Sequence, residues 1–174
     1  MNTIIEKFKT LRLKNCANNI ETIIEQANQK NLSPLQTIER LIDIEIEHRD
    51  KARKILRFKQ SKLDTKVTID QFDFKYHKSR QNQKGLILNL MDLEFINQKK
   101  DIILIGNPGT GKSFLARAIA YAATQAGLKT LFTTAMDMVN HLIEAEADHN
   151  LLKKLYAFNQ TSVELKHQCH YMNP

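Results

Sequence analysis

The chain has 174 residues, of which 42% are hydrophobic, and this length suffices for one domain of ordinary size or two small ones. No run of eighteen apolar residues occurs, so the sequence predicts no transmembrane helix and no membrane partner. The formal net charge of +7 favours a polyanionic partner, although a generally lysine-rich composition without any nucleic-acid role is an alternative explanation.

Residues 1–66 are predicted to form an all-helical N-terminal domain. Apolar residues recur at helical spacing through residues 2–30, which predicts a helix there. Ser33 is a good N-cap, Pro34 suits the first helical position, and Gln36 stands three residues after the cap. A long second helix is therefore expected from Pro34 to about residue 60. Acidic residues occupy its first half and basic residues its second half, an order that complements the helix dipole.

The basic half of this long helix is a candidate DNA-binding surface. Arg53, Lys54 and Arg57 share one helical side, so they can meet phosphates together. Contacts of this kind give strongly salt-dependent binding. The alternative is a solvated face that completes the C-terminal end of a helix. The candidate DNA-binding residues are Arg49, Arg53, Lys54 and Arg57.

Residues 67–100 are predicted to be a connector followed by a short helix. The connector carries two aromatic residues, Phe72 and Phe74. Residues 86–96 have apolar side chains at helical spacing, which predicts a short amphipathic helix.

The pattern changes at residue 101, where an α/β segment is expected to begin. Residues 102–105 form a short, fully apolar run, which is typical of a buried strand. A helix is predicted from about Lys112 to Ala126, and a second strand over residues 130–134. Two further helices are predicted over residues 135–147 and 149–158.

A phosphate-binding loop is predicted between the first of these strands and the helix that follows it. Residues 106–113 read GNPGTGKS and match the pattern G-x-x-x-x-G-K-S/T. Glycines let the chain curl around a phosphate, and consecutive N–H groups form an anion-binding concavity. Lys112 can reach the β- and γ-phosphates, and the Ser113 hydroxyl can bind Mg²⁺. A glycine-rich turn without a ligand is the alternative. The candidate binding residues are Gly106, Asn107, Pro108, Gly109, Thr110, Gly111, Lys112, Ser113 and Phe114.

The stretch GNPGTGKSFLARAIA resembles the phosphate loop of AAA+ ATPases, and the chain from about residue 5 to 160 is similar to the IstB-like proteins. These are ATP-binding helper proteins of insertion-sequence transposition. The resemblance rests also on FDF in the connector and on TTAMDMV after the second predicted strand. It implies an α/β fold class, with the N-terminal helical domain followed by an incomplete P-loop NTPase domain of three αβα layers.

The same resemblance implies cofactors and partners. ATP with Mg²⁺ would bind the loop, and the aromatic connector around Phe72 and Phe74 would lie near the adenine, with burial in the core as the alternative. The implied partners are double-stranded DNA, a transposase and further copies of the chain. A DnaC-type helicase loader, a non-enzymatic DNA-binding or inhibitory fragment and a small-molecule P-loop kinase remain alternatives, and the long basic helix argues against the kinase. The two cysteines are far apart in sequence, so a reducing cytoplasm is the expected location.

The final residues depart from the family pattern. After LLKKLYAF the family continues with an apolar strand that ends in two acidic residues, whereas this chain reads NQTSVELKHQCHYMNP. Glu164 stands alone in a polar segment and is not assigned the acidic role. We therefore expect a partial ATP-binding domain over residues 101–160, a divergent tail over 161–174, and a C-terminally truncated chain. Weak ATP affinity and negligible hydrolysis follow, since the acidic pair and an arginine finger are absent from the sequence.

The truncation also predicts that the sheet is incomplete. Only residues 102–105 and 130–134 are expected to form strands, and neither would have its family neighbour. Such strands expose apolar edges, pair in a non-native way, or depend on a partner.

Overall fold

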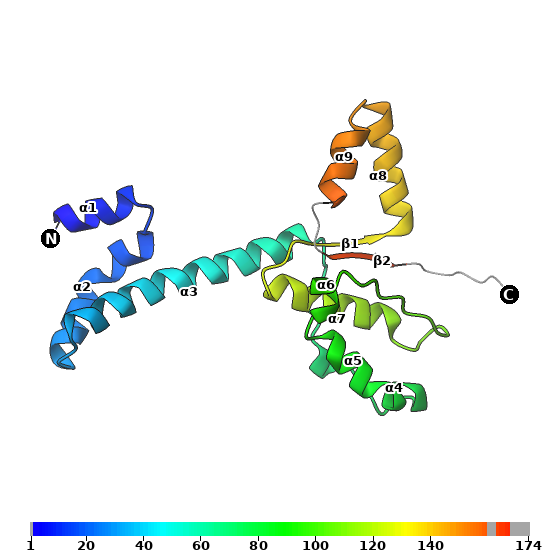
Figure 1. Ribbon diagram of the computed structural model, residues 1–174, viewed down its shortest axis with the longest axis horizontal. Helices are drawn as coiled ribbons and strands as arrows, with labels where there is room; N and C mark the ends of the chain where they lie inside the picture. The colour runs from blue at the N-terminus through cyan, green and yellow to red at the C-terminus, as the bar shows by residue number, and fades with distance from the viewer. Residues whose placement is uncertain (1, 160–162, 168–174) are drawn as a thin grey trace. The chain divides into compact units, whose positions relative to one another are not determined.

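The structure is a computed structural model that describes residues 2–159 and 163–167. The described residues are mostly helical, with two short strands that pair with each other (Figure 1). The chain divides into two compact units, Met1–Arg53 and Lys54–Pro174. Among the described residues, no helix has the length and apolar character needed to cross a membrane.

The first unit contains α1 (Asn2–Thr10), α2 (Lys14–Gln29) and the first part of α3 (Pro34–Gln60). The prediction of one continuous helix over residues 2–30 is wrong, because the chain turns between α1 and α2. At this turn Arg12 adopts a left-handed conformation with φ of 58°, which ends a right-handed helix. The turn lets α1 contact α2.

The start of α3 is confirmed in detail. The backbone N–H of Ser33 donates to Oε1 of Gln36 over 2.8 Å, and the N–H of Gln36 donates to Oγ of Ser33 over 3.3 Å. This is the reciprocal pair of a capping box. The helix begins at Pro34 and ends at Gln60, as the sequence predicts.

A buried glutamate joins α2 and α3 within the first unit. Glu45 of α3 is 5% exposed, and its Oε2 accepts hydrogen bonds from the backbone N–H groups of Asn15 and Cys16 at the start of α2. Its Oε1 accepts from Nε of Arg49 over 2.8 Å. Burial alone would raise the pKa of Glu45, but these hydrogen bonds outweigh burial and hold the pKa below its ordinary value. Glu45 therefore serves as a charged cap for α2.

The connector of the second unit is more broken than the sequence predicts. It holds a single 3-10 turn, η1 (Ile69–Gln71), and then α4 (Lys78–Asn82), α5 (Lys84–Leu90) and α6 (Glu94–Asn97). One helix over residues 86–96 is therefore a wrong prediction.

The break between α5 and α6 has a packing cause. Leu93 has φ of 59°, in the left-handed region, so the right-handed helix cannot continue through it. Its side chain is buried against Ile119 and Ala123. Burial of this leucine offsets the local backbone cost.

The rest of the second unit contains α7 (Lys112–Gln125), β1 (Thr130–Thr134), α8 (Ala135–Ala147), α9 (Leu151–Asn159) and β2 (Val163–His167). Helix α7 lies along both strands, as Figure 1 shows. The predicted helices over 112–126 and 135–147 and the strand over 130–134 are confirmed, and the helix predicted over 149–158 begins two residues later.

The strands themselves differ from the prediction. β1 and β2 run parallel, with Thr130 opposite Val163 and Thr134 opposite His167. Residues 102–105 form no strand, and Ile103 and Ile105 are 81% and 90% exposed. The expectation that 102–105 and 130–134 are the two strands is therefore wrong for the first, and the strand within the tail was missed.

Backbone pairing explains why residues 163–167, and not residues 102–105, form the second strand. β1 bonds β2 along one edge, and the N–H of Phe132 in β1 also donates to the carbonyl of Ser61 over 2.8 Å. A strand requires a partner for its backbone groups, and residues 102–105 have none in the part of the chain that the structure describes. Ile103 and Ile105 are exposed, which agrees with the first of the three expected outcomes for this segment, although the segment is not a strand.

Candidate functional site

The predicted phosphate loop, residues 106–113, curls immediately before α7. Gly109 and Gly111 have φ of 78° and 93°, in the left-handed region that glycine enters readily. Helix α7 begins at Lys112, and its first turn is closed by the N–H of Leu115, which donates to the carbonyl of Gly111 over 2.9 Å. The N-terminal end of α7, with its partial positive charge, therefore faces the loop.

Lys112 closes the curl from inside. Its Nζ donates to the carbonyl oxygens of Gly106 and Asn107 over 2.7 and 2.8 Å. Oγ1 of Thr110 also donates to the carbonyl of Asn107, over 2.8 Å. The loop's own carbonyl oxygens therefore hold the ammonium group of Lys112 against the curl.

Arg80 of α4 holds the other side of the same loop. Its Nη2 and Nε donate to the carbonyls of Gly109 and Thr110, both over 3.0 Å, and its Nη1 donates to the carbonyl of Asp73 over 3.0 Å. The guanidinium carbon lies 4.6 Å from the ring centroid of Phe72 and 4.8 Å from that of Tyr76. Arg80 thus links the connector to the loop through both hydrogen bonds and aromatic contacts.

A small apolar core lies beneath the loop. Phe72 is 6% exposed and packs with Ile87 and Leu115. Its ring lies 4.9 Å from that of Phe74 and 5.5 Å from that of Phe114, centroid to centroid. Of the two alternatives for the connector aromatics, burial in the core holds for Phe72.

This core approaches the loop too closely for a side chain at position 111. A Cβ built on Gly111 would lie 2.6 Å from Cε2 of Phe72 and 3.2 Å from Nη2 of Arg80. At Gly109 a Cβ would meet nothing within 4 Å. Gly111 is therefore required by close packing as well as by its backbone conformation, whereas Gly109 is required only by its backbone.

The remaining predicted loop residues are placed as follows. Pro108 lies in the exposed part of the curl with Asn107. Ser113 is the second residue of α7, directly after Lys112, and is partly buried. Phe114 packs against the core below the loop, so it supports the loop from beneath.

The predicted DNA-binding residues on α3 have different surroundings. In the first unit, Arg49 donates to Glu45 and to the carbonyl of Arg12, and Arg53 pairs with Asp50 at 3.2 Å. In the second unit, Lys54 is exposed. Arg57 of the same unit donates to the carbonyl of Gly127 over 3.3 Å and to Gln60. Arg49 and Arg57 therefore bond to backbone carbonyls outside α3, while Arg53 pairs with Asp50 of the same helix and Lys54 is exposed.

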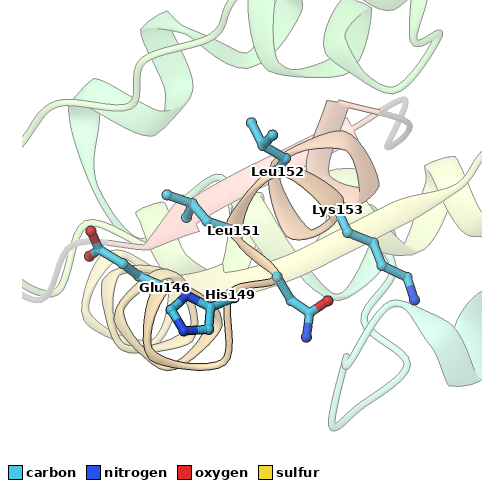
Figure 2. Close-up of a pocket in the computed structure, with 6 residues that line it drawn as sticks. Glu146, His149, Leu151, Leu152 and Lys153 are labelled. Atoms are coloured by element: carbon cyan, nitrogen blue, oxygen red, sulfur yellow. The ribbon is translucent and has the colours of Figure 1, made fainter.

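Two hollows lie elsewhere in the second unit. One, of about 450 Å³, lies at the turn between α8 and α9, where Figure 2 shows Glu146, His149, Leu151, Leu152 and Lys153 around it. The other, of about 410 Å³, includes Thr134 at the end of β1. Its charged side chains neutralise one another, with Arg117 3.5 Å from Asp64. Neither lining contains a residue of the phosphate loop.

In the part of the chain that the structure describes, no group of three or more His, Cys, Asp or Glu side chains lies close enough together to hold a metal ion. Residues 161–162 and 168–174 of the predicted divergent tail lie outside the described residues. Glu164 lies in β2, opposite Leu131 in the strand register.

Sequence reasoning missed Arg80. In the sequence it is one basic residue in the polar stretch KYHKSRQNQK, with no spacing that marks it as special. Arg80 and the loop residue Thr110 are thirty residues apart in the sequence, and the tertiary fold brings them into contact. The one available signal is the nearby pair of aromatic residues, Phe72 and Tyr76, because arginine stacks readily on aromatic rings.

Comparison with known proteins gives a consistent picture. The profile of the family described as "IstB-like ATP binding protein" matches residues 6–172, which extends past the limit of about 160 expected from the sequence. A relative from Geobacillus stearothermophilus, named as an ATP-binding protein of insertion sequence IS5376, is 35% identical over 169 residues. That match covers 97% of this chain and 66% of the relative.

Two further relatives carry similar names. One from Bacteroides fragilis, named for an IS21-like insertion sequence and ATP binding, is 27% identical over 86% of this chain and 56% of its own length. One from Pseudomonas aeruginosa, named for insertion sequence IS21 and ATP binding, is 26% identical over 93% of this chain and 60% of its own length. The chain thus spans roughly three fifths of the length of these curated relatives. Because the family profile matches nearly the whole chain, the chain belongs to the IstB-like ATP-binding proteins.

Proposed function

We propose that residues 106–114 bind the phosphates of ATP, and that the chain serves DNA transposition as an ATP-binding helper. The observation that carries the first part is the closed curl of residues 106–113, with Lys112 held over it and α7 starting beneath it. The names of the relatives support the second part. They favour transposition over helicase loading.

The chain's own groups fit a triphosphate. The ammonium of Lys112 can exchange its two carbonyl partners for β- and γ-phosphate oxygens without moving far, because both partners belong to the loop itself. The N–H groups at the start of α7 and the helix dipole stabilise negative charge. Gly109 and Gly111 allow the backbone to approach the phosphates closely.

Magnesium fits the same site through an oxygen donor. Ser113, next to Lys112 at the start of α7, would supply its hydroxyl to Mg²⁺. When bound, the ion neutralises part of the phosphate charge. The base of the nucleotide would lie toward the connector, where Phe74 is partly buried and Tyr76 is exposed.

Nucleotide binding is tested by titrating the chain with a fluorescent ATP analogue in the presence of Mg²⁺. Wild type should bind, and Lys112→Ala should lose at least about ten-fold in affinity, since a charge-assisted hydrogen bond contributes roughly 1.5–3 kcal/mol. Lys100→Ala is a matched control, because Lys100 is an exposed lysine in the same segment. Equal affinities for wild type and Lys112→Ala would refute the proposed role of the loop.

We further propose negligible ATP hydrolysis by this 174-residue polypeptide. Its sequence carries no acidic pair after an apolar strand, and Glu164 is the lone carboxylate of the segment opposite β1. Positioning an attacking water and stabilising transition-state charge require such groups together with an arginine finger. Phosphate release above the level of Lys112→Ala would contradict this proposal.

The domain layout and the partners follow from the same family assignment. We propose a helical N-terminal domain over residues 1–66 and a connector with a short helix over 67–100. A partial ATP-binding domain of AAA+ type with αβα layers would follow over 101–160, and a divergent tail over 161–174. Double-stranded DNA, a transposase and further copies of the chain are the proposed partners. The candidate DNA-binding residues are Arg49, Arg53, Lys54 and Arg57.

Contact with DNA is tested most cleanly with the two exposed bases, Arg53 and Lys54. Removing two phosphate contacts should lower the slope of log affinity against log salt by about two. Arg53→Ala with Lys54→Ala should therefore weaken retention of duplex DNA mainly at low salt. An unchanged salt slope would remove these residues from the proposed surface.

A further inference from the structure

Four carbonyl oxygens of the phosphate loop are held by two cationic side chains. Lys112 holds those of Gly106 and Asn107, and Arg80 holds those of Gly109 and Thr110. The two cations differ in origin. Lys112 belongs to the loop and is a proposed phosphate ligand, whereas Arg80 comes from α4 and uses its donors on the backbone.

The hydrogen bonds of Arg80 fix the direction of the loop amides. In a trans peptide the C=O and the following N–H point in opposite directions. The carbonyls of Gly109 and Thr110 point at the guanidinium, so the N–H groups of Thr110 and Gly111 point away from it. The N–H of Thr110 meets the carbonyl of Asn107 over 3.4 Å, which is a long hydrogen bond within the loop. Arg80 therefore turns the N–H of Gly111, and that of Thr110 once this long bond opens, to the face opposite itself, where an anion can accept hydrogen bonds from them.

Arg80 is itself fixed by its surroundings. Its guanidinium carbon lies 4.6 Å from the ring centroid of Phe72 and 4.8 Å from that of Tyr76. A third bond, from Nη1 to the carbonyl of Asp73, ties it to the connector. Because Phe72 belongs to the core below the loop, the position of Arg80 is set by packing and does not depend on a ligand.

We propose that Arg80 is a positioning residue that holds the phosphate loop in its anion-binding curl before nucleotide arrives. This inference rests on the proposed nucleotide binding by residues 106–114. Arg80 acts from the carbonyl side of the loop and leaves the phosphates to the amides and to Lys112. Loss of Arg80 frees Gly109–Gly111 to sample other conformations. The apparent affinity for nucleotide is then the affinity of the closed loop multiplied by the fraction of time that the loop is closed.

The proposal predicts a distinctive pattern of binding. If a residue only preorganises the loop, its loss lowers the affinity for every phosphate ligand by the same factor, because that factor is a property of the free protein. A loop closed one tenth of the time gives about a ten-fold loss for both ATP and ADP. If a residue instead contacts the γ-phosphate, its loss lowers the affinity for ATP much more than the affinity for ADP.

The test uses Arg80→Gln and Arg80→Lys, with Arg40→Gln as the matched control, because Arg40 is an exposed arginine of α3. Lysine keeps the charge but lacks the planar fork that reaches two carbonyls at once, so it should restore only part of the effect. The first measurement is ¹⁵N relaxation of the nucleotide-free protein at Gly109, Thr110 and Gly111. The second is the affinity for ATP and for ADP. Circular dichroism confirms that each variant is folded, and Arg80→Lys replaces Arg80→Gln if the latter is not.

The expected result is a fall in order parameter at the three loop residues from about 0.85 to about 0.6 or lower in Arg80→Gln. ATP and ADP affinities should fall together, and Arg40→Gln should match wild type. Unchanged loop order would overturn the inference, as would a loss confined to ATP. If wild type binds nucleotide and Lys112→Ala abolishes binding while Arg80→Gln changes nothing, only this inference fails. If wild type binds no nucleotide, the proposed function fails with it.

Discussion

Replacing Gly111 with alanine should destabilise the second unit more than the same change at Gly109. Both glycines have positive φ, 93° and 78°, so alanine at either site carries a backbone cost of roughly 1–2 kcal/mol. Only at Gly111 would the new Cβ meet a neighbour, Cε2 of Phe72, at 2.6 Å. Relieving that overlap requires a shift of a buried ring and adds about 1–3 kcal/mol.

The expected losses in free energy of unfolding are therefore roughly 2–5 kcal/mol for Gly111→Ala and 1–2 kcal/mol for Gly109→Ala. Urea unfolding of the nucleotide-free chain, followed by circular dichroism, gives both values. In a Phe72→Ala background the overlap with the ring is gone and the 3.2 Å contact with Nη2 of Arg80 remains, so most of the difference between the two glycine substitutions should disappear. Equal costs in the wild-type background, or a difference that Phe72→Ala leaves undiminished, would refute the argument from close packing.

Two further predictions concern the helical unit and the segment before the loop. Glu45→Gln should lower the stability of the first unit by about 1–3 kcal/mol at neutral pH, because it removes a buried charge that accepts three hydrogen bonds, while Glu47→Gln, at an exposed site on the same helix, should change little. Since the folded pKa of Glu45 lies below its unfolded value, this stabilisation is complete near neutral pH and is lost as pH falls below about 4, so urea midpoints of wild type and Glu45→Gln should converge in acid. Ile103→Ser with Ile105→Ser should cost less than about 1 kcal/mol in total and should reduce self-association measured by light scattering, whereas a loss of several kcal/mol would show that these residues are buried in solution.

Local signals in the sequence predict much of the fold. The capping pair Ser33 and Gln36 places the start of α3, and the alternation from loop to helix to strand places α7 and β1. The glycines of the motif predict a curled loop, and Gly109 and Gly111 have the positive φ values that allow such a curl. In each case the cause lies within a few residues of the effect.

Features that depend on distant partners could not be predicted in this way. Residues 102–105 have the composition of a buried strand, but a strand is defined by its neighbours, and β1 pairs with residues 163–167 instead. The left-handed Leu93 depends on burial against Ile119 and Ala123, which no local pattern encodes.

The residues of the candidate site also fall into a group that the sequence identifies and a group that only the tertiary structure identifies. Every residue of the loop itself is visible as a motif, because the motif is contiguous. Arg80 and Phe72 support the loop from the connector, and only the tertiary contacts identify them. The chemistry of the site is thus local in sequence, while its preorganisation is not.

The most direct test of the central claim is a titration of the ¹⁵N-labelled chain with ATP and Mg²⁺, followed by amide chemical shifts. The amides of Gly106–Ser113, except that of Pro108, which has no N–H, and those of the first turn of α7 should shift and saturate together, and Lys112→Ala should abolish these changes. Shifts that are absent from this loop, or that are centred on the hollow between α8 and α9, would contradict the proposal that residues 106–114 bind the nucleotide.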